Sequence, residues 1–207
     1  MPRPHREISL LLAERDPVMA RLVERHGPMH LPPPPKASQR FEQLARSIAF
    51  QQLAGRAAST IWGRVRALVP GEFTPEAVLS VPEGDLAAAG LSRAKLASIR
   101  DLASHVADGR VALERIGRLG DDEVIAHLTE VRGIGPWTAQ MFLLFSLHRL
   151  DVWPTGDLGV RIGFAKAWGL PDPPTASELE PLGDPYRPYR SVVAWYCWRA
   201  ADTTTPD

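Results

Sequence analysis

A glycine-rich segment, residues 131–139 with the sequence Val-Arg-Gly-Ile-Gly-Pro-Trp-Thr-Ala, contains residue types that can bind a phosphate group. Gly133 and Gly135 allow a tight turn and a close approach of the backbone to a ligand, and Pro136 suits the first position of a helix. Backbone N–H groups at the start of a helix are unpaired and bind anions. A simple turn between helices is the alternative. Because two predicted helices flank the turn, we favour phosphate binding. Backbone carbonyls of such a turn could also hold a monovalent cation.

A single carboxylate, Asp157, follows in the segment Pro-Thr-Gly-Asp-Leu-Gly, residues 154–159. Its place before a predicted helix is typical of an N-cap residue, and this structural role would suffice if Asp157 stood alone. A carboxylate facing a sugar could instead stabilise an oxocarbenium-like transition state or activate water, as in glycoside chemistry. The phosphate-binding turn and this carboxylate together indicate chemistry on a nucleic acid.

Aromatic residues are frequent in the same parts of the chain: Trp137, Trp153, Trp195, Tyr196 and Trp198. Core packing explains any one of them. Flat aromatic faces are also what a flipped-out base stacks on, and a cationic base gains further from cation–π attraction.

Two polar segments offer further contacts to nucleic acid. Gln51, Gln52 and Leu53 lie between two predicted helices. An amide there could pair with an orphaned base while an apolar side chain fills the gap in the duplex; a polar turn between helices is the alternative. For Arg190 we expect an internal ion pair with a carboxylate rather than a phosphate contact.

The elements that must position these residues are helical. Apolar residues recur at helical spacing, and no convincing strand alternation or internal repeat is present. The fold class is therefore all-α. Asp16 and Pro17 have the types of an N-cap and a first helical residue, and Pro32 to Pro35 read as a linker. Further helices are predicted over 57–69, 86–90, 94–107, 121–131, 141–147 and 189–200.

Composition excludes several classes of protein. The chain has 207 residues and one cysteine, Cys197, which excludes a disulfide framework, a cysteine zinc site and a four-cysteine iron–sulfur cluster. No signal peptide and no apolar run long enough to span a membrane are visible, so we expect a cytoplasmic location. The net charge is zero, which argues against a nucleic-acid partner unless a local basic face or backbone N–H groups make the contacts.

Taken together, these motifs resemble the helix-hairpin-helix DNA glycosylase superfamily, most closely its 3-methyladenine DNA glycosylase II branch. The resemblance rests on the segment 133–139, the loop 154–157, the residues 51–53 and the ending 188–198, and it covers about Asp16 to Arg199. It implies two helical lobes with a cleft between them: a central domain over 37–149, and a second lobe built from 1–36 and 150–207.

The resemblance also implies roles for individual residues. Asp157 falls on the catalytic aspartate, and Trp137 and Trp198 fall on aromatic residues of the base pocket. DNA-binding positions are Gly133, Ile134 and Gly135 in the hairpin and Gln51, Gln52 and Leu53 in the loop that fills the stack. Either Gln52 or Leu53 could be the wedge. Backbone carbonyls of Thr129, Val131 and Gly133 fall where relatives hold a sodium or potassium ion.

Three departures refine the resemblance. The single cysteine excludes the iron–sulfur branch, and the chain has neither room nor strand pattern for an N-terminal β-domain. Bifunctional members carry a lysine nucleophile where this chain has Trp137, so no strand cleavage is expected. The sequence therefore predicts a monomeric, monofunctional enzyme without an organic cofactor. It would act on double-stranded DNA containing alkylated purines in the bacterial nucleoid, and would leave abasic sites.

Three alternatives stay open. A non-catalytic helix-hairpin-helix module would bind DNA but would need neither Asp157 nor its aromatic neighbours. A glycosylase for another lesion would have to read a neutral base through hydrogen bonds. A helical protein with a protein partner would not bind DNA containing an abasic site.

Overall fold

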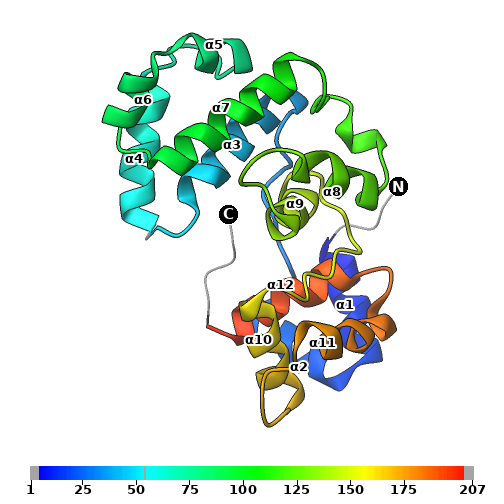
Figure 1. Cartoon of the computed structure of the whole chain (residues 1–207). Coiled ribbons are helices and arrows are strands. Elements are labelled where there is room, and N and C mark those ends of the chain that lie inside the picture. Colours follow the sequence, from blue (N-terminus) through cyan, green and yellow to red (C-terminus); the bar gives the residue numbers. More distant parts are fainter. Residues whose placement is uncertain (1–4, 54, 203–207) are drawn as a thin grey trace. The chain divides into compact units, whose positions relative to one another are not determined.

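The computed structural model describes residues 5–53 and 55–202, which form helices, turns and loops without a β-strand (Figure 1). The chain folds into two compact units. Unit 1 combines both ends of the chain, Met1–Pro34 and Leu143–Asp207, and unit 2 is the continuous segment Pro35–Phe142. The all-α prediction is confirmed. The predicted second lobe also included residues 1–4 and 203–207, which lie outside the described residues.

Unit 1 is built on two pairs of packed helices. At the N-terminal end α1 (His5–Arg15) packs on α2 (Pro17–His26), and at the C-terminal end α10 (Leu158–Trp168) packs on α12 (Arg190–Ala200). The short helix α11 (Ala176–Leu182) and a 3₁₀ turn, η4 (Asp184–Tyr186), connect α10 to α12. Nine consecutive residues of α12, Arg190–Trp198, are buried, so this helix is the centre of the unit.

Asp16 joins the two helix pairs of unit 1. As predicted, it caps α2: its Oδ1 accepts a hydrogen bond of 2.6 Å from the Val18 N–H, and Pro17 takes the first helical position. Its Oδ2 accepts hydrogen bonds from the Trp168 indole, at 3.3 Å, and from the Tyr186 hydroxyl. Burial and the neighbouring Asp16 raise the pKa of Tyr186, so the hydroxyl stays a donor. Through Asp16 the aromatic pair Trp168 and Tyr186 is therefore bonded to the start of α2.

Unit 2 has a long central helix, α7 (Arg93–Ala107), against which α3 (Arg40–Phe50) and α5 (Pro75–Ser80) pack. The remaining helices are α4 (Gly55–Ala67), α6 (Glu83–Ala88), α8 (Asp121–Thr129) and α9 (Pro136–Met141), with 3₁₀ turns η1 (Ala37–Gln39) and η2 (Ile116–Arg118). The core is apolar and continuous through α3 and α7, where Leu44, Ile48, Ile99 and Leu102 are at most 2% exposed.

The boundaries between the units differ in part from the prediction. The first lies at Pro34–Pro35, inside the proline run predicted to be a linker. The second lies at Phe142–Leu143 rather than after residue 149, because the following residues belong to unit 1. Phe145 packs on Trp198 with ring centroids 5.8 Å apart, and Ser191 bonds to the carbonyl of Arg149. The helix predicted over 141–147 is present only in part and is of another type: α9 ends at Met141, and residues Phe142–Ser146 form a π-helical turn, η3.

A histidine pair in unit 1 makes its stability depend on pH. The rings of His5 and His148 meet edge to face with centroids 5.4 Å apart. Burial lowers the pKa of both side chains, and for His5 the nearby His148 and His30 lower it further. A histidine with a lowered pKa binds fewer protons in the folded state, so stability is lost as the pH falls below about 6.5, the unfolded value.

We therefore expect the melting temperature to fall between about pH 7 and pH 5. The variant His148→Asn should weaken this dependence, because it removes one titrating ring and Asn tolerates the left-handed backbone of this position, φ 52°. Thermal melts of both proteins across this pH range are the measurement. Equal losses in the two proteins would contradict the assignment to this pair.

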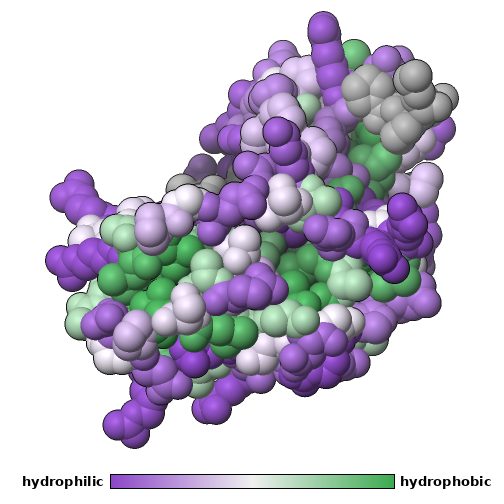
Figure 2. Space-filling model, turned by 90° about the horizontal axis from the view of Figure 1, so that it is seen from above, coloured by the Kyte–Doolittle hydropathy of each residue, from purple (hydrophilic) through white to green (hydrophobic). Residues whose placement is uncertain are grey.

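The surface mixes hydrophilic and apolar areas. Figure 2 shows hydrophilic side chains projecting around one face, with apolar residues gathered between them. Scattered exposed apolar residues are normal for a folded chain. Among the described residues no helix combines the length and the hydropathy needed to cross a membrane.

Candidate functional site

Asp157 is the N-cap residue of α10. A turn precedes Asp157, because the Asp157 N–H bonds to the Pro154 carbonyl at 2.9 Å. The backbone of Asp157 is extended, with φ −78° and ψ 120°. The Oδ1 atom accepts a hydrogen bond of 2.9 Å from the Val160 N–H. The residue is only 8% exposed, which an ordinary surface cap would not require.

A second donor to the same carboxylate comes from α12. The indole Nε1 of Trp198 donates to Oδ1 of Asp157 at 3.0 Å, and Trp198 is 1% exposed. The structure thus brings together two of the residues selected from the sequence. Trp198 was predicted to line the base pocket; in the structure its N–H holds the acid, and stacking against a base remains a prediction.

A very close helix crossing brings Asp157 and Trp198 together. A Cβ atom built on Gly163 of α10 would lie 1.7 Å from the carbonyl oxygen of Cys197 of α12, so the two backbones touch there. Burial, and then the Asp157 carboxylate, raise the pKa of the Cys197 thiol. The thiol therefore stays protonated and is no nucleophile. Gly163 was not selected from the sequence, where only its place inside a predicted helix could have marked it, since glycine lets two backbones approach closely.

The electrostatics of this part of the site suit one task. Asp157 receives two N–H donors on one oxygen, and the positive end of the α10 dipole points at it. A buried anion held in a fixed position can stabilise positive charge that develops nearby. Among the described residues, no group of three or more His, Cys, Asp or Glu side chains is placed to hold a metal ion.

The glycine turn lies in unit 2 and joins α8 to α9. Gly133 has φ 79°, a left-handed backbone that favours glycine, and a Cβ there would lie 2.4 Å from Oγ of Ser98. Ile134 is buried at 4% exposure. The Arg132 N–H donates to Oδ2 of Asp101 at 2.7 Å, which fixes the turn on α7.

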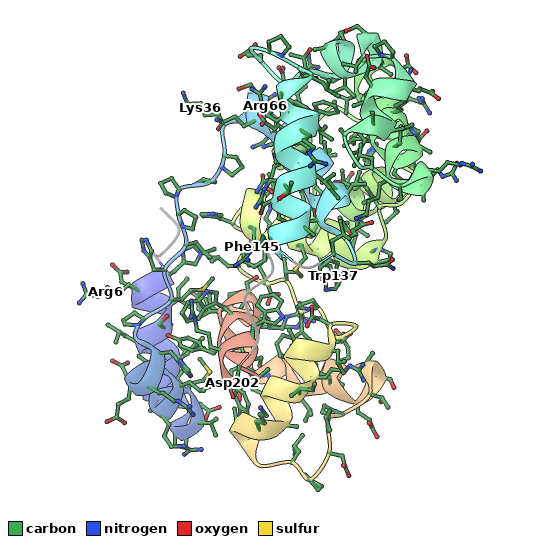
Figure 3. The ribbon with its side chains drawn as sticks, turned by 90° about the vertical axis from the view of Figure 1, so that its left-hand side faces the viewer. Arg6, Lys36, Arg66, Trp137, Phe145 and Asp202 are labelled. Carbon is green, nitrogen blue, oxygen red and sulfur yellow. The ribbon has the colours of Figure 1, made fainter. Side chains whose placement is uncertain are left out.

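Gly135 differs from Gly133, because the fold does not require a glycine there. Its φ is −95° and a Cβ would meet no atom within 4 Å. It precedes Pro136, which is the first residue of α9 as predicted. Trp137 follows at 40% exposure, and Figure 3 shows its side chain. The open space over Gly135 is where a ligand can reach the backbone.

Two of the three carbonyls predicted to hold a cation accept hydrogen bonds within the protein. The Val131 carbonyl accepts from the Ile134 N–H at 3.1 Å, and the Gly133 carbonyl accepts from Nε2 of Gln51 at 3.0 Å. Thr129 is the last residue of α8. Each carbonyl oxygen has a second lone pair, so this donor set still fits a monovalent cation.

The loop after α3 lies beside the turn. Gln51 points inward: its amide also lies 3.4 Å from Oγ1 of Thr138. Gln52 adopts a left-handed backbone, φ 56°, and is exposed, and Leu53 is 40% exposed. Of the three residues of this loop that were predicted to contact DNA, the last two therefore present their side chains to solvent.

Two further features of the chain lie outside this constellation. Arg190 pairs internally, with its Nε 2.7 Å from Oδ1 of Asp151, which confirms the predicted ion pair. A cavity of about 840 Å³ in unit 2 is lined by residues that include Lys36, Phe73 and Arg66. In Figure 3 Lys36 and Arg66 lie far from Trp137, so this cavity is not part of the glycine turn.

A turn between helices that offers backbone N–H groups, together with a buried aspartate at a helix start, defines a helical protein of the helix-hairpin-helix class. Residues 45–185 match the HhH-GPD superfamily of base excision DNA repair proteins, and the chain belongs to this family. The resemblance inferred from the sequence is thereby confirmed.

Relatives with known names share most of the chain. A DNA-3-methyladenine glycosylase of Schizosaccharomyces pombe is 36% identical over 172 residues, which are 80% of this chain and 75% of the relative. A solved structure of an S. pombe 3-methyladenine DNA glycosylase in complex with abasic DNA has a TM-score of 0.83 at 33% identity and covers 93% of this chain and 95% of its own. A DNA-3-methyladenine glycosidase of Bacillus halodurans has a TM-score of 0.84 at 35% identity and covers 98% and 91%.

Proposed function

We propose that this protein is a monofunctional DNA glycosylase that removes alkylated purines of the 3-methyladenine and 7-methylguanine type. The observation that carries the proposal is the Asp157 carboxylate, buried at the start of α10 and held by N–H donors from Val160 and Trp198. The named relatives support the reaction, since they are 3-methyladenine glycosylases and one is bound to abasic DNA.

The reaction breaks the N-glycosidic bond of a flipped-out nucleotide. An N3- or N7-alkylated purine carries a positive charge, so it leaves as a neutral base with the bonding electron pair and needs little help from an acid. The sugar becomes an oxocarbenium-like cation, which the Asp157 anion stabilises. Water then adds to the anomeric carbon and loses a proton, and the product is an abasic site.

Unit 2 supplies the contacts to DNA in this proposal. The turn Gly133–Gly135 takes a backbone phosphate through the N–H groups of its two glycines, since the Ile134 N–H already bonds to the Val131 carbonyl. Gln52 or Leu53 fills the gap left by the flipped nucleotide. Trp137 offers an exposed ring to the base. Carbonyls of Thr129, Val131 and Gly133 would hold a sodium or potassium ion, which would add positive charge at the phosphate.

The test is excision from a panel of duplexes that each contain one defined lesion. We expect release of 3-methyladenine and 7-methylguanine, no release from undamaged DNA, and heat-labile abasic sites as the product. Release of only an oxidised or mismatched base would replace the proposed lesion class. Tight binding to abasic DNA without any excision would identify a non-catalytic module, and no DNA binding at all would indicate a protein partner.

We also expect base removal without strand cleavage, because Trp137 occupies the position of the lysine nucleophile in bifunctional relatives. Product DNA should stay intact until it is treated with base or heat. Borohydride trapping is the measurement, since a Schiff base between a lysine and the sugar would be reduced to a stable protein–DNA adduct. Detection of that adduct would refute the monofunctional assignment.

The two glycines of the turn should respond differently to alanine. Gly135→Ala should fold with nearly unchanged stability and bind DNA about tenfold more weakly, because its Cβ would occupy only the open space that a phosphate approaches. Gly133→Ala should cost about 1–3 kcal/mol of stability, because φ is 79° and Ser98 lies beneath. Thermal melts and DNA titrations separate the two effects. Unchanged DNA affinity of Gly135→Ala would argue against phosphate binding at this turn.

A further inference from the structure

Gln51 connects two parts of unit 2 that the proposed function uses separately. We define the plug loop as Gln51–Leu53 and the hairpin turn as Gly133–Gly135. We propose that Gln51 is a positioning residue that couples the plug loop to the hairpin turn, so that a phosphate held at the turn sets the loop for insertion into the duplex. This inference rests on the proposed function, because it concerns DNA that is held at the turn.

The hydrogen bonds of Gln51 carry the proposal. Its Nε2 donates to the Gly133 carbonyl at 3.0 Å and lies 3.4 Å from Oγ1 of Thr138, which is 5% exposed. Both partners belong to the hairpin turn or to the first turn of α9. Because the amide N–H groups of Gln51 bond to acceptors of the protein, this side chain is placed to hold the loop rather than to pair with an orphaned base.

Helix α7 forms a common base for the loop and the turn. Lys95 donates from Nζ to the Ala49 carbonyl at 2.8 Å, which fixes the end of α3 just before the plug loop. Ser98 lies under Gly133, and Asp101 accepts from the Arg132 N–H. These α7 residues are spaced by three, so they share one face of the helix. Gln51 adds a direct link between the loop and the turn through its bond to the Gly133 carbonyl. Figure 1 shows α3, α7, α8 and α9, the helices that carry these segments.

The residues of the plug loop have different roles in this proposal. Gln51 is bound to the hairpin turn, whereas Gln52 and Leu53 are exposed. The phosphate contact at the turn needs no lesion, but insertion of the loop needs a gap in the duplex. Loss of the Gln51 bond should therefore reduce the preference for damaged DNA more than the affinity for any DNA.

The experiment uses the full chain and the variant Gln51→Met, which keeps the length of the side chain and removes the donor. Two duplexes are titrated, one undamaged and one with a stable abasic-site analogue next to 2-aminopurine, whose fluorescence reports unstacking. We expect unchanged thermal stability and unchanged affinity for undamaged DNA. The preference for the abasic duplex should fall about fivefold to tenfold, as for one lost hydrogen bond, and the fluorescence change should fall with it.

Two more variants complete the design. Gln51→Leu also lacks the donor and adds no charge beside the proposed phosphate site, and should show the same loss if Gln51→Met fails to fold. Gln39→Met makes the same side-chain change at an exposed position of unit 2, where the amide oxygen accepts only a local hydrogen bond from the Lys36 N–H, and should keep the DNA affinities and the preference of the wild type. Equal weakening of Gln51→Met on both duplexes would show a direct DNA contact and overturn the proposal, as would wild-type preference. If the wild-type chain itself did not prefer the abasic duplex, the proposed function would fail instead.

Discussion

Replacing Asp157 by Asn should slow base excision about 100- to 1000-fold, the loss typical of removing one preorganised electrostatic contact from a transition state. The change removes the negative charge and keeps the Oδ1 acceptor. Asn is as good an N-cap as Asp, and its Oδ1 can still accept from the Val160 N–H and from the Trp198 indole. The effect should therefore report the charge of Asp157 rather than the integrity of α10.

The measurement is the single-turnover rate of 3-methyladenine release, with enzyme in excess over duplex. The affinity of Asp157→Asn for abasic DNA should stay close to that of the wild-type chain, because the hairpin turn belongs to unit 2. Its melting temperature should also stay close, because Asn caps α10 as well as Asp does. A wild-type excision rate would contradict the catalytic role of Asp157 and leave it as a buried helix cap.

The fold could be predicted from the sequence where local signals were strong. Helical periodicity gave the all-α class, Asp16 and Pro17 gave the start of α2, and Pro136 gave the start of α9. The residues 142–146 were harder, because an apolar run shows burial but does not distinguish an α-helix from a π-helical turn. The boundary at Phe142 also depends on the packing of Phe145 on Trp198, which no local pattern reveals.

The sequence identified residues of the candidate site, but it did not reveal the contacts that they make with one another. Sequence reasoning selected Asp157, Trp198 and Gln51, and it assigned Trp198 to a base and Gln51 to DNA, roles that stay predictions. In the structure their N–H groups bond to Asp157 and to Gly133. These partners lie 41 and 82 residues away in the chain, so only the fold brings them together.

A single methyl group added at Gly163 should cost much stability. An alanine Cβ would lie 1.7 Å from the carbonyl oxygen of Cys197, 2.4 Å from its carbonyl carbon and 2.8 Å from its Cα. All three are backbone atoms, so no flexible side chain can move aside and α10 must shift from α12. We expect Gly163→Ala to lose about 3 kcal/mol of stability, at the upper end of ordinary overpacking, and roughly 10 °C in melting temperature.

The same shift should affect catalysis, because α10 carries Asp157 and α12 carries Trp198. Excision below the melting temperature should therefore slow even where the protein is folded. Gly63→Ala is the matched control: it also lies inside a helix, α4, but its Cβ would meet no atom within 4 Å. There alanine should raise stability by up to about 1 kcal/mol, the difference in helix propensity. A melting temperature that falls for Gly163→Ala and rises for Gly63→Ala would assign the cost to the α10–α12 crossing. An equal rise in both variants would show that the two helices can separate freely and that Gly163 does not set the distance between Asp157 and Trp198.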